Sequence, residues 1–588
     1  MHKGNRLHYA IVLLGIVISI RHAVAETPAE RPKKVYAHYM GCAPAATGPQ
    51  DWARYHEAST LRHDTRNDPS RFGGHVRNWE LVPENSHLTA EQSADLEIRR
   101  AIRIGIDGFA IDAWAGSNDA KKTLDALFKV AEEKNYPFEI TVCIDPNCLG
   151  GESPEQVIRY VLDKHGKSSK LARRDGKPLI FGYQSVFLGI GFGMYSLGQK
   201  PEWKGKEKDI PNSAALRTTP EGWALLGESM KDLEKKVGQP LYIHYCLSAF
   251  EYGVDRKNVS PDLLLKAAPV IAKFVGAIGS FNWTGPLQDQ IGQAVIAAGA
   301  EWSCPVGMYQ KENVPYECYM PEGTEWLSGC WESAIRTNST ILQLITWNDY
   351  GENTNIAPAY NTRYTVYDLT GYYIQLWKTG KAPVPDHDRV YVTYRKYPTG
   401  AKVFPFKTKF DVKNSTLEVV TILTAPATIR LPGRNVEYEA PAGFFRKQVP
   451  LTVGAVSAEL LRAGKVTLKI ESPEPVTDKP FREDHGMVCY SSEFMRLWKE
   501  DFGDAKPLLY SEYGDVDGDG LPNWFEMYWF GKFLDFSTMT GADPKAIGPN
   551  GKTNLENYQA QVDPTMSLPV AGENPVRDPL DELGRAKK

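Results

Sequence analysis

Residues 341–353 read ILQLITWNDYGEN and decide the fold of the longest part of this chain. The stretch begins with an almost unbroken apolar run, 341–347, which is typical of a strand buried on both faces of a parallel sheet. Gly351 then allows a sharp backbone turn, because glycine has no Cβ to clash. Two acids, Asp349 and Glu352, follow the run. The sequence therefore predicts a buried strand that presents two carboxylates at one edge of a sheet.

A pair of carboxyl groups is what glycoside hydrolysis requires, one to protonate the leaving oxygen and one to activate water or attack carbon. We therefore take Asp349 and Glu352 as the candidate catalytic pair. Acids after a strand are also often solvated loop residues or helix caps. Their spacing leaves the stereochemistry open. Three residues span up to about 10 Å, whereas inverting pairs lie about 6.5–9.5 Å apart and retaining pairs about 5–5.5 Å apart.

The composition is that of a large soluble globular protein with two to four domains. The chain has 588 residues, of which 42% are hydrophobic and 24% charged. Its net charge of −4 gives no indication of a nucleic-acid partner. The chain also has 14 Trp, 29 Tyr and 22 Phe, a supply that suits stacking on sugar rings, although most of these side chains must fill the core.

The first 25 residues have the pattern of a cleavable signal peptide. Lys3 and Arg6 make the start basic, 9–20 is an apolar run, and the small-residue site 23–25 predicts cleavage after Ala25. The run is shorter than the about 20 residues that span a bilayer, so we expect no membrane span. The predicted location is therefore secreted, periplasmic or at the cell surface.

From residue 33 to 380, short apolar strands alternate with amphipathic helices. Thr89 with Gln92 forms a capping box, and Ser153-Pro154 opens a later helix. The eight expected strands are 35–40, 108–114, 138–145, 179–183, 241–246, 277–283, 305–309 and 341–347. Eight strand–helix pairs predict an α/β fold of the (β/α)8 TIM-barrel type, with the active site at the carboxyl ends of the strands.

Polar and aromatic side chains lie at most of these predicted strand ends. Together they resemble the lining of a sugar pocket, although any one of them is equally well a cap or a satisfied core group. The candidate substrate-binding residues are His38, Tyr39, Asp112, Trp114, Asp145, His244, Trp283, Trp347, Asn348 and Tyr350.

A linker at 383–386 precedes a change of pattern. Residues 387–472 contain short alternating runs such as RVYVTY, STLEVVTIL and KVTLKI and no strong helix. Strand runs separated by turn signals predict a β-sandwich accessory domain.

The last segment, 481–588, contains one sharp motif. DVDGDG at 515–520, followed five residues later by an acid, fits the calcium loop D-x-D-x-D-G-x5-E. The expected ligands of a structural Ca²⁺ are Asp515, Asp517, Asp519, the carbonyl of Leu521 and Glu526. The alternative is a solvated acidic turn. We expect no cofactor for catalysis, and the tail is a candidate for contact with a cell surface or matrix.

Four stretches resemble glycoside hydrolase family 71, the α-1,3-glucanases or mutanases. They are AHYMG at 37–41, GIDGFAID at 105–112, Asp145 and, most specifically, TWNDYGE at 346–352. The resemblance implies an inverting endo-hydrolase of α-1,3-glucan with Asp349 and Glu352 as its acid/base pair. We assign Glu352 as the acid and Asp349 as the base, and the reverse order stays open. The tail resembles thrombospondin type 3 or dockerin-like calcium repeats.

The chain also departs from the pattern of family 71. Asn353, Thr354 and Asn355 follow Glu352 where the family often has Ser-His-Tyr, and Asp112 stands where it tends to have Asn. Family 99, which acts on α-mannosides, has a similar loop. Hydrolysis of another α-glycan such as mannan, or carbohydrate binding without catalysis, therefore remains an alternative to cleavage of α-glucan.

Overall fold

The structure is a computed structural model. It describes residues 31–42, 80–83, 86, 88–112, 118–145, 152–183, 219–247, 261–281, 286–307, 312–313, 317–318, 323–350, 353–401, 415–480, 487–507, 511, 513–515, 518–530, 543–560, 562 and 564. The predicted signal peptide lies outside these ranges. Within them, no helix combines the length and the apolar character needed to cross a membrane.

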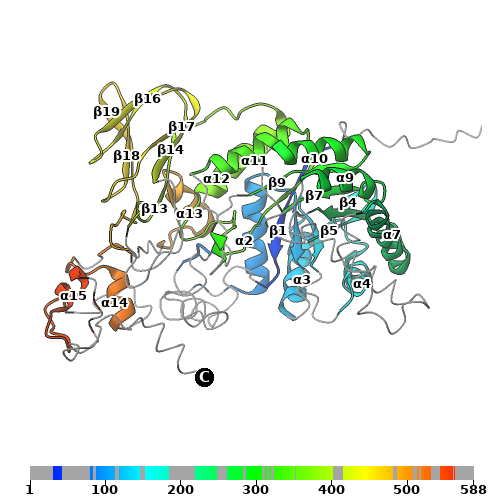
Figure 1. Cartoon of the computed structure of the whole chain (residues 1–588), viewed down its shortest axis with the longest axis horizontal. Helices are drawn as coiled ribbons and strands as arrows, with labels where there is room; N and C mark the ends of the chain where they lie inside the picture. The colour runs from blue at the N-terminus through cyan, green and yellow to red at the C-terminus, as the bar shows by residue number, and fades with distance from the viewer. Residues whose placement is uncertain are drawn as a thin grey trace, which may run out of the picture.

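The larger part of the chain is built on one parallel sheet (Figure 1). Its strands, in spatial order, are β8 (Glu301–Ser303), β7 (Ala277–Gly279), β6 (Tyr242–Cys246), β5 (Lys177–Gly182), β3 (Glu139–Ile144), β2 (Gly108–Asp112), β1 (Lys34–Met40), β12 (Ile341–Leu344) and β9 (Pro305–Val306). Only Cys304 separates β8 from β9, so these two occupy one strand position. Because β8 pairs with β7 and β9 pairs with β12, the sheet curls back on itself as a ring of eight positions.

The helices predicted between these strands are present. They are α2 (Ala90–Arg103), α3 (Asn118–Glu133), α4 (Pro154–His165), α7 (Pro220–Val237), α9 (Pro261–Ile271), α10 (Pro286–Ala297), α11 (Glu325–Arg336) and α12 (Thr365–Thr379). Both capping boxes form, at Thr89 with Gln92 and at Ser153 with Gln156. This confirms a TIM-barrel-like α/β fold. Smaller additions are β4 (Arg173–Arg174), which pairs with β5, and the hairpin of β10 (Glu312–Asn313) with β11 (Glu317–Cys318).

Side-chain alternation along each strand divides the barrel into an inner and an outer layer. On β1, Val35, Ala37 and Tyr39 belong to the large core between sheet and helices. Tyr36 belongs instead to a separate inner cluster with residues of β2, β3, β5, β6, β7 and β12. His38 has the same parity as Tyr36, so the alternation directs its imidazole into the barrel. Only side chains with this inward parity can reach a ligand inside the barrel.

A β domain follows the barrel and lies beside it at the upper left of Figure 1. One antiparallel sheet contains β17 (Gly443–Pro450), β14 (Thr416–Leu423), β13 (Arg389–Arg395) and β20 (Met487–Ser491). The other contains β16 (Val436–Ala440), β15 (Ala427–Leu431), β18 (Ser457–Arg462) and β19 (Lys465–Glu471). Buried residues of both sheets form one core, as in a sandwich. The fourth strand of the first sheet, β20, lies beyond residue 472, where the β domain was predicted to end.

Buried polar contacts join the β domain to the barrel. Helix α13 (Phe494–Phe502) follows β20 and carries Asp501, whose carboxylate accepts hydrogen bonds from Arg100 Nε at 2.6 Å and the Tyr364 hydroxyl at 2.7 Å. On β14, Glu418 accepts from the backbone N–H of Thr324 at 2.7 Å. Both carboxylate side chains are fully buried. The two parts of the chain are therefore packed as one body rather than joined by a free linker.

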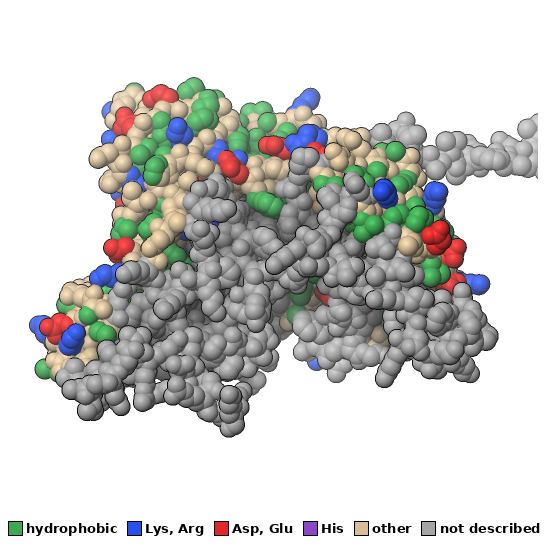
Figure 2. All heavy atoms as spheres, viewed as in Figure 1, with side chains coloured by type: hydrophobic (Ala, Val, Ile, Leu, Met, Phe, Trp, Pro, Cys, Tyr) green, Lys and Arg blue, Asp and Glu red, His purple; other side chains and the backbone are tan. Residues whose placement is uncertain are grey.

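The described surface shows no dominant charge of one sign on the face seen in Figure 2. Lys, Arg, Asp and Glu side chains are interspersed there with apolar ones over the β domain and the outer helices. Such a mixed surface gives no basis for steering a strongly charged partner. The tail adds two short helices, α14 (Asn523–Phe530) and α15 (Asn554–Ala560).

Candidate active site

Asp349 lies on a tight turn directly after the last barrel strand. The backbone N–H of Trp347 donates to the carbonyl of His38 at 2.6 Å, which extends the contact with β1 past the end of β12. The chain then folds back, so that Thr346 N–H donates to the carbonyl of Thr354 at 2.9 Å. The two hydroxyls of Thr346 and Thr354 are 3.0 Å apart and close the turn.

Within this turn Asp349 is held by its backbone and is half-buried. Its N–H donates to Thr346 Oγ1 at 3.0 Å, and its carbonyl accepts from Thr354 N–H at 3.2 Å. These hydrogen bonds fix the main chain of Asp349. Its side chain is short and has few rotatable bonds, so the fixed backbone restricts where the carboxylate can lie. Its predicted partner Glu352 lies outside the described residues.

Asn348 connects this turn to the neighbouring strand. Its side-chain oxygen accepts from Met40 N–H at 2.7 Å, and its side-chain nitrogen donates to the Met40 carbonyl at 3.2 Å. Met40 is itself in register with Asp112 on β2. Because β1 lies between β2 and β12, the strand ends bearing Asp112 and Asp349 are two strand spacings apart, about 10 Å.

The inner face of the barrel below this rim carries a polar cluster. His38 Nε2 is 3.5 Å from Asp112 Oδ2. On its other side, His38 Nδ1 is 3.4 Å from Nε2 of Gln343, a residue that we did not predict. The same amide nitrogen is 4.0 Å from Sγ of Cys143. His38, Asp112 and Gln343 are each less than 5% exposed, so these contacts form in a low-dielectric interior.

His244 and Asp145 complete the buried polar groups of the predicted set, at 1% and 6% exposure. Burial lowers the pKa of His244 to about 3, so its imidazole is neutral at ordinary pH. Its ring is 4.4 Å from that of Phe181, centroid to centroid. Gly279 on β7 makes room for it, because a Cβ there would lie 2.4 Å from His244 Cε1.

Aromatic rings border the cluster beside His38. The ring centroids of Tyr183 and Phe281 are 4.5 Å apart with the planes inclined at 65°, and Phe281 meets the His38 ring edge-on at 5.2 Å. Neither ring was among the predicted site residues. The sequence signal for Tyr183 was its place at the predicted end of the fourth strand, and for Phe281 its place near the end of the sixth.

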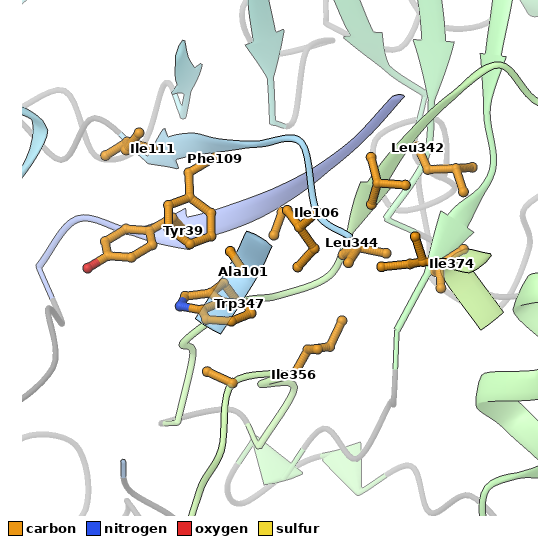
Figure 3. Packing of buried hydrophobic residues seen from close by; sticks show 14 of the residues in the cluster. Tyr39, Ala101, Ile106, Phe109, Ile111, Leu342, Leu344, Trp347, Ile356 and Ile374 are labelled. Carbon is orange, nitrogen blue, oxygen red and sulfur yellow. The ribbon is translucent and has the colours of Figure 1, made fainter. Parts of the chain in front are cut away.

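The structure corrects the expected roles of Tyr39 and Trp347. Both are fully buried on the helix side of the sheet, where they pack around Phe109 (Figure 3) at centroid distances of 4.9 Å and 5.2 Å. The indole N–H of Trp347 donates to the buried carboxylate of Glu97. Tyr350 is buried in the same hydrophobic cluster. Strand parity explains the result for Tyr39, because Tyr39 alternates with the inward-facing His38, whereas Trp347 lies beyond the end of β12 at Leu344.

Two further predicted sugar contacts, Trp114 and Trp283, lie outside the described residues. The structure brings His38, Asp112 and Gln343 into contact and buries the two other predicted polar residues, Asp145 and His244. This arrangement places acids and hydrogen-bonding groups at the carboxyl ends of barrel strands, where TIM-barrel enzymes carry out their chemistry. A half-buried carboxylate at such a rim can serve as a general base or acid.

The predicted calcium loop is described in part. The carboxylate of Asp515 accepts from the backbone N–H groups of Gly518 at 2.7 Å and Gly520 at 2.8 Å, and Asp519 Oδ1 accepts from Leu521 N–H at 2.8 Å. Glu526 is buried on α14. The described residues contain no group of three or more acidic, histidine or cysteine side chains placed to hold a metal, and Asp517 is not among them.

Comparison with known proteins shows similarity to glycoside hydrolases. Residues 288–488 match Glycosyl hydrolase family 71. The chain is 29% identical over 444 residues to a mutanase of Penicillium rubens, covering 69% of this chain and 84% of the relative. It is 20% identical over 421 residues to the glucan endo-1,3-alpha-glucosidase agn1 of Schizosaccharomyces pombe, covering 67% and 90%.

Among solved structures, the GH99 endo-alpha-mannosidase of Bacteroides thetaiotaomicron covers 58% of this chain and 97% of its own, with 13% identity and a TM-score of 0.39. That likeness is too distant to bear on fold or substrate. The match at 288–488, by contrast, includes the strand β12 and the turn that holds Asp349. Residues 288–488 are therefore similar to glycosyl hydrolase family 71, and the chain is a glycoside hydrolase.

Proposed function

We propose that the protein hydrolyses α-1,3-glucosidic bonds of α-glucan. It cleaves internal bonds of the polysaccharide, with inversion at the anomeric carbon. The observation that carries this proposal is the position of Asp349, on an anchored turn at the carboxyl end of the last barrel strand, inside the family 71 match. The named activities of the mutanase and glucan endo-1,3-alpha-glucosidase relatives support the choice of substrate.

In this proposal Asp349 is the general base and Glu352 the general acid. The base removes a proton from a water molecule as that water attacks the anomeric carbon, and the acid protonates the departing glucosyl oxygen. Asp112, Asp145 and His244 hold the sugar from the barrel side. His244 is kept neutral by burial, so it serves as a hydrogen-bonding group rather than as a charge.

Release of reducing sugar from insoluble α-1,3-glucan tests the activity, with α-mannan and an α-1,4-glucan as competing substrates. We expect the first to be cleaved and the others not. Cleavage of mannan alone would overturn the choice of substrate. Proton NMR of the first anomer released from a soluble oligosaccharide tests inversion, since a retaining enzyme yields the other anomer first.

Asp349→Asn tests the assignment of the base. It replaces one carboxylate oxygen by an amide and leaves the backbone anchors to Thr346 and Thr354 in place. Removal of a general base costs about 10²–10⁴-fold in rate. Asp504→Asn, at a side chain 98% exposed beyond α13, is the matched control. Equal activities in the two variants would exclude Asp349 from catalysis.

For the tail we propose a structural Ca²⁺ held by Asp515, Asp517, Asp519, the Leu521 carbonyl and Glu526. The support is the motif spacing together with the turn that Asp515 organises, in which Gly518 and Gly520 have positive φ values of 75° and 96°. Bound Ca²⁺ would neutralise the clustered acids and fasten the loop to α14. Calcium should raise the unfolding temperature of the full chain. An unchanged temperature, with Asp517→Ala behaving as wild type, would remove the proposal.

Secretion is proposed from the leader pattern of residues 1–25, with release after Ala25. Mass spectrometry of the protein recovered from culture medium tests it. A mature chain beginning at Glu26 is expected, and a chain that retains residues 1–25 inside the cell would contradict it. The proposed partner is the polysaccharide substrate, and contact of the tail with a cell surface is tested by binding of a variant truncated after residue 507.

A further inference from the structure

We propose that Gln343 is a positioning residue that acts through His38 to set which oxygen of Asp112 binds a substrate hydroxyl. The inference deepens the proposed hydrolase function and rests on it. Three side chains from three adjacent strands, β12, β1 and β2, form the line Gln343–His38–Asp112 on the inner face of the barrel. Gln343 has no part in the predicted catalytic pair.

The first step is the tautomer of His38. The amide nitrogen of Gln343 is a donor only, and it faces His38 Nδ1 at 3.4 Å. Nδ1 must therefore accept, which places the ring proton of a neutral imidazole on Nε2. That proton faces Asp112 Oδ2 at 3.5 Å. The edge-on ring of Phe281, 5.2 Å away, restricts rotation of the imidazole.

The second step concerns Asp112. Its Oδ2 faces His38, while its Oδ1 has no hydrogen-bond partner among the described residues and is buried. A buried carboxylate oxygen without a donor is costly. A hydroxyl group of a bound glucosyl ring has the chemistry to supply that donor. With Gln343 in place, Oδ1 is the oxygen of Asp112 that still lacks a donor, so the sugar hydroxyl meets one defined acceptor.

A reversed amide would undo this order. If an acceptor oxygen faced His38 Nδ1, the proton would sit there, and Nε2 would approach Asp112 as a lone pair against a carboxylate. The Asp112 carboxylate would then rotate away from His38 or remain without its hydrogen bond from Nε2. Gln343→Met keeps the length and approximate volume of the side chain but removes the donor, so it separates the amide from the packing.

The test joins spectroscopy with a double-mutant cycle. Histidine-selective ¹⁵N labelling resolves the tautomers of the His residues, and the spectrum of His38→Gln assigns His38. We expect the Nε2–H form in the wild type and loss of its fixed signature in Gln343→Met. On soluble α-1,3-gluco-oligosaccharides, Gln343→Met should lower kcat/KM about tenfold, mainly through KM, as loss of one substrate hydrogen bond does.

In an Asp112→Asn background, Gln343→Met should cause no further loss, because the relay then has no carboxylate to orient. Two results would overturn the inference: an Nδ1–H tautomer of His38 in the wild type, or an undiminished effect of Gln343→Met in the Asp112→Asn background. The spectroscopic arm needs no turnover. An enzyme inactive on α-1,3-glucan but with the expected tautomer would refute the proposed function and leave the relay standing.

Discussion

Breaking the buried contact between α13 and the barrel is predicted to lower the free energy of unfolding. Asp501 is fully buried, as is the guanidinium of Arg100, and Arg103 adds a second guanidinium. Burial alone would raise the pKa of the Asp501 carboxyl, but the charges of Arg100 and Arg103 and the hydroxyl of Tyr364 outweigh it and hold the pKa below its usual value. Asp501→Asn removes the negative charge and leaves the buried guanidinium of Arg100 without a compensating carboxylate.

Breaking a buried pair by removing one partner costs about 3–5 kcal/mol, because an uncompensated charge stays behind. Urea unfolding followed by tryptophan fluorescence and circular dichroism measures this cost as a lower midpoint. Glu500→Gln is the matched control, since Glu500 pairs with the same Arg103 at 3.2 Å but is 41% exposed. That exposed pair should contribute less than about 1 kcal/mol. A cost below 1 kcal/mol for Asp501→Asn would refute the view that barrel and β domain stand as one body.

Other predictions follow from single contacts. Burial would raise the pKa of Glu301, but bonds from Arg174, Thr340 and Tyr242 outweigh it and lower the pKa to about 2. Its stabilisation, about 3 kcal/mol, is therefore complete above about pH 4.5 and lost as pH falls toward 2. Glu301→Gln should flatten this acid limb in unfolding measured from pH 6 to 2, and a limb of unchanged slope would contradict the assignment. Tyr39→Phe should leave kcat/KM within twofold, because Tyr39 lies in the core; a tenfold loss would restore it as a sugar contact. Gly279→Ala should destabilise by about 1–3 kcal/mol, measured as a lower urea midpoint, because its Cβ would meet His244; an unchanged midpoint would show that the ring moves freely.

Much of the barrel was predictable because its signals are local. Apolar runs marked the strands, and the capping boxes at Thr89 and Ser153 marked helix starts that the structure shows within a residue. The seventh strand was predicted at 305–309, which begins too late in the sequence. The structure begins that position at Glu301, a charged residue that no apolar pattern selects and that Arg174 makes tolerable inside the fold.

The site was harder to predict, because reaching a strand end is not the same as facing the ligand. Tyr39 and His38 are adjacent in sequence, yet one packs against Phe109 and the other lines the barrel. Parity counted from Tyr36 would have separated them, and would also have selected Gln343 from the inward positions of the last strand. The fourth strand of the first β sheet, β20, was missed because it pairs with β13 from almost a hundred residues away, which no local pattern encodes.

The most direct measurement is the rate of reducing-sugar release from insoluble α-1,3-glucan by wild type, Asp349→Asn and Asp504→Asn at equal folded concentration. The wild type and Asp504→Asn should cleave the polymer alike, and Asp349→Asn should be at least about a hundredfold slower. Full activity of Asp349→Asn, or no cleavage by the wild type, would contradict the account.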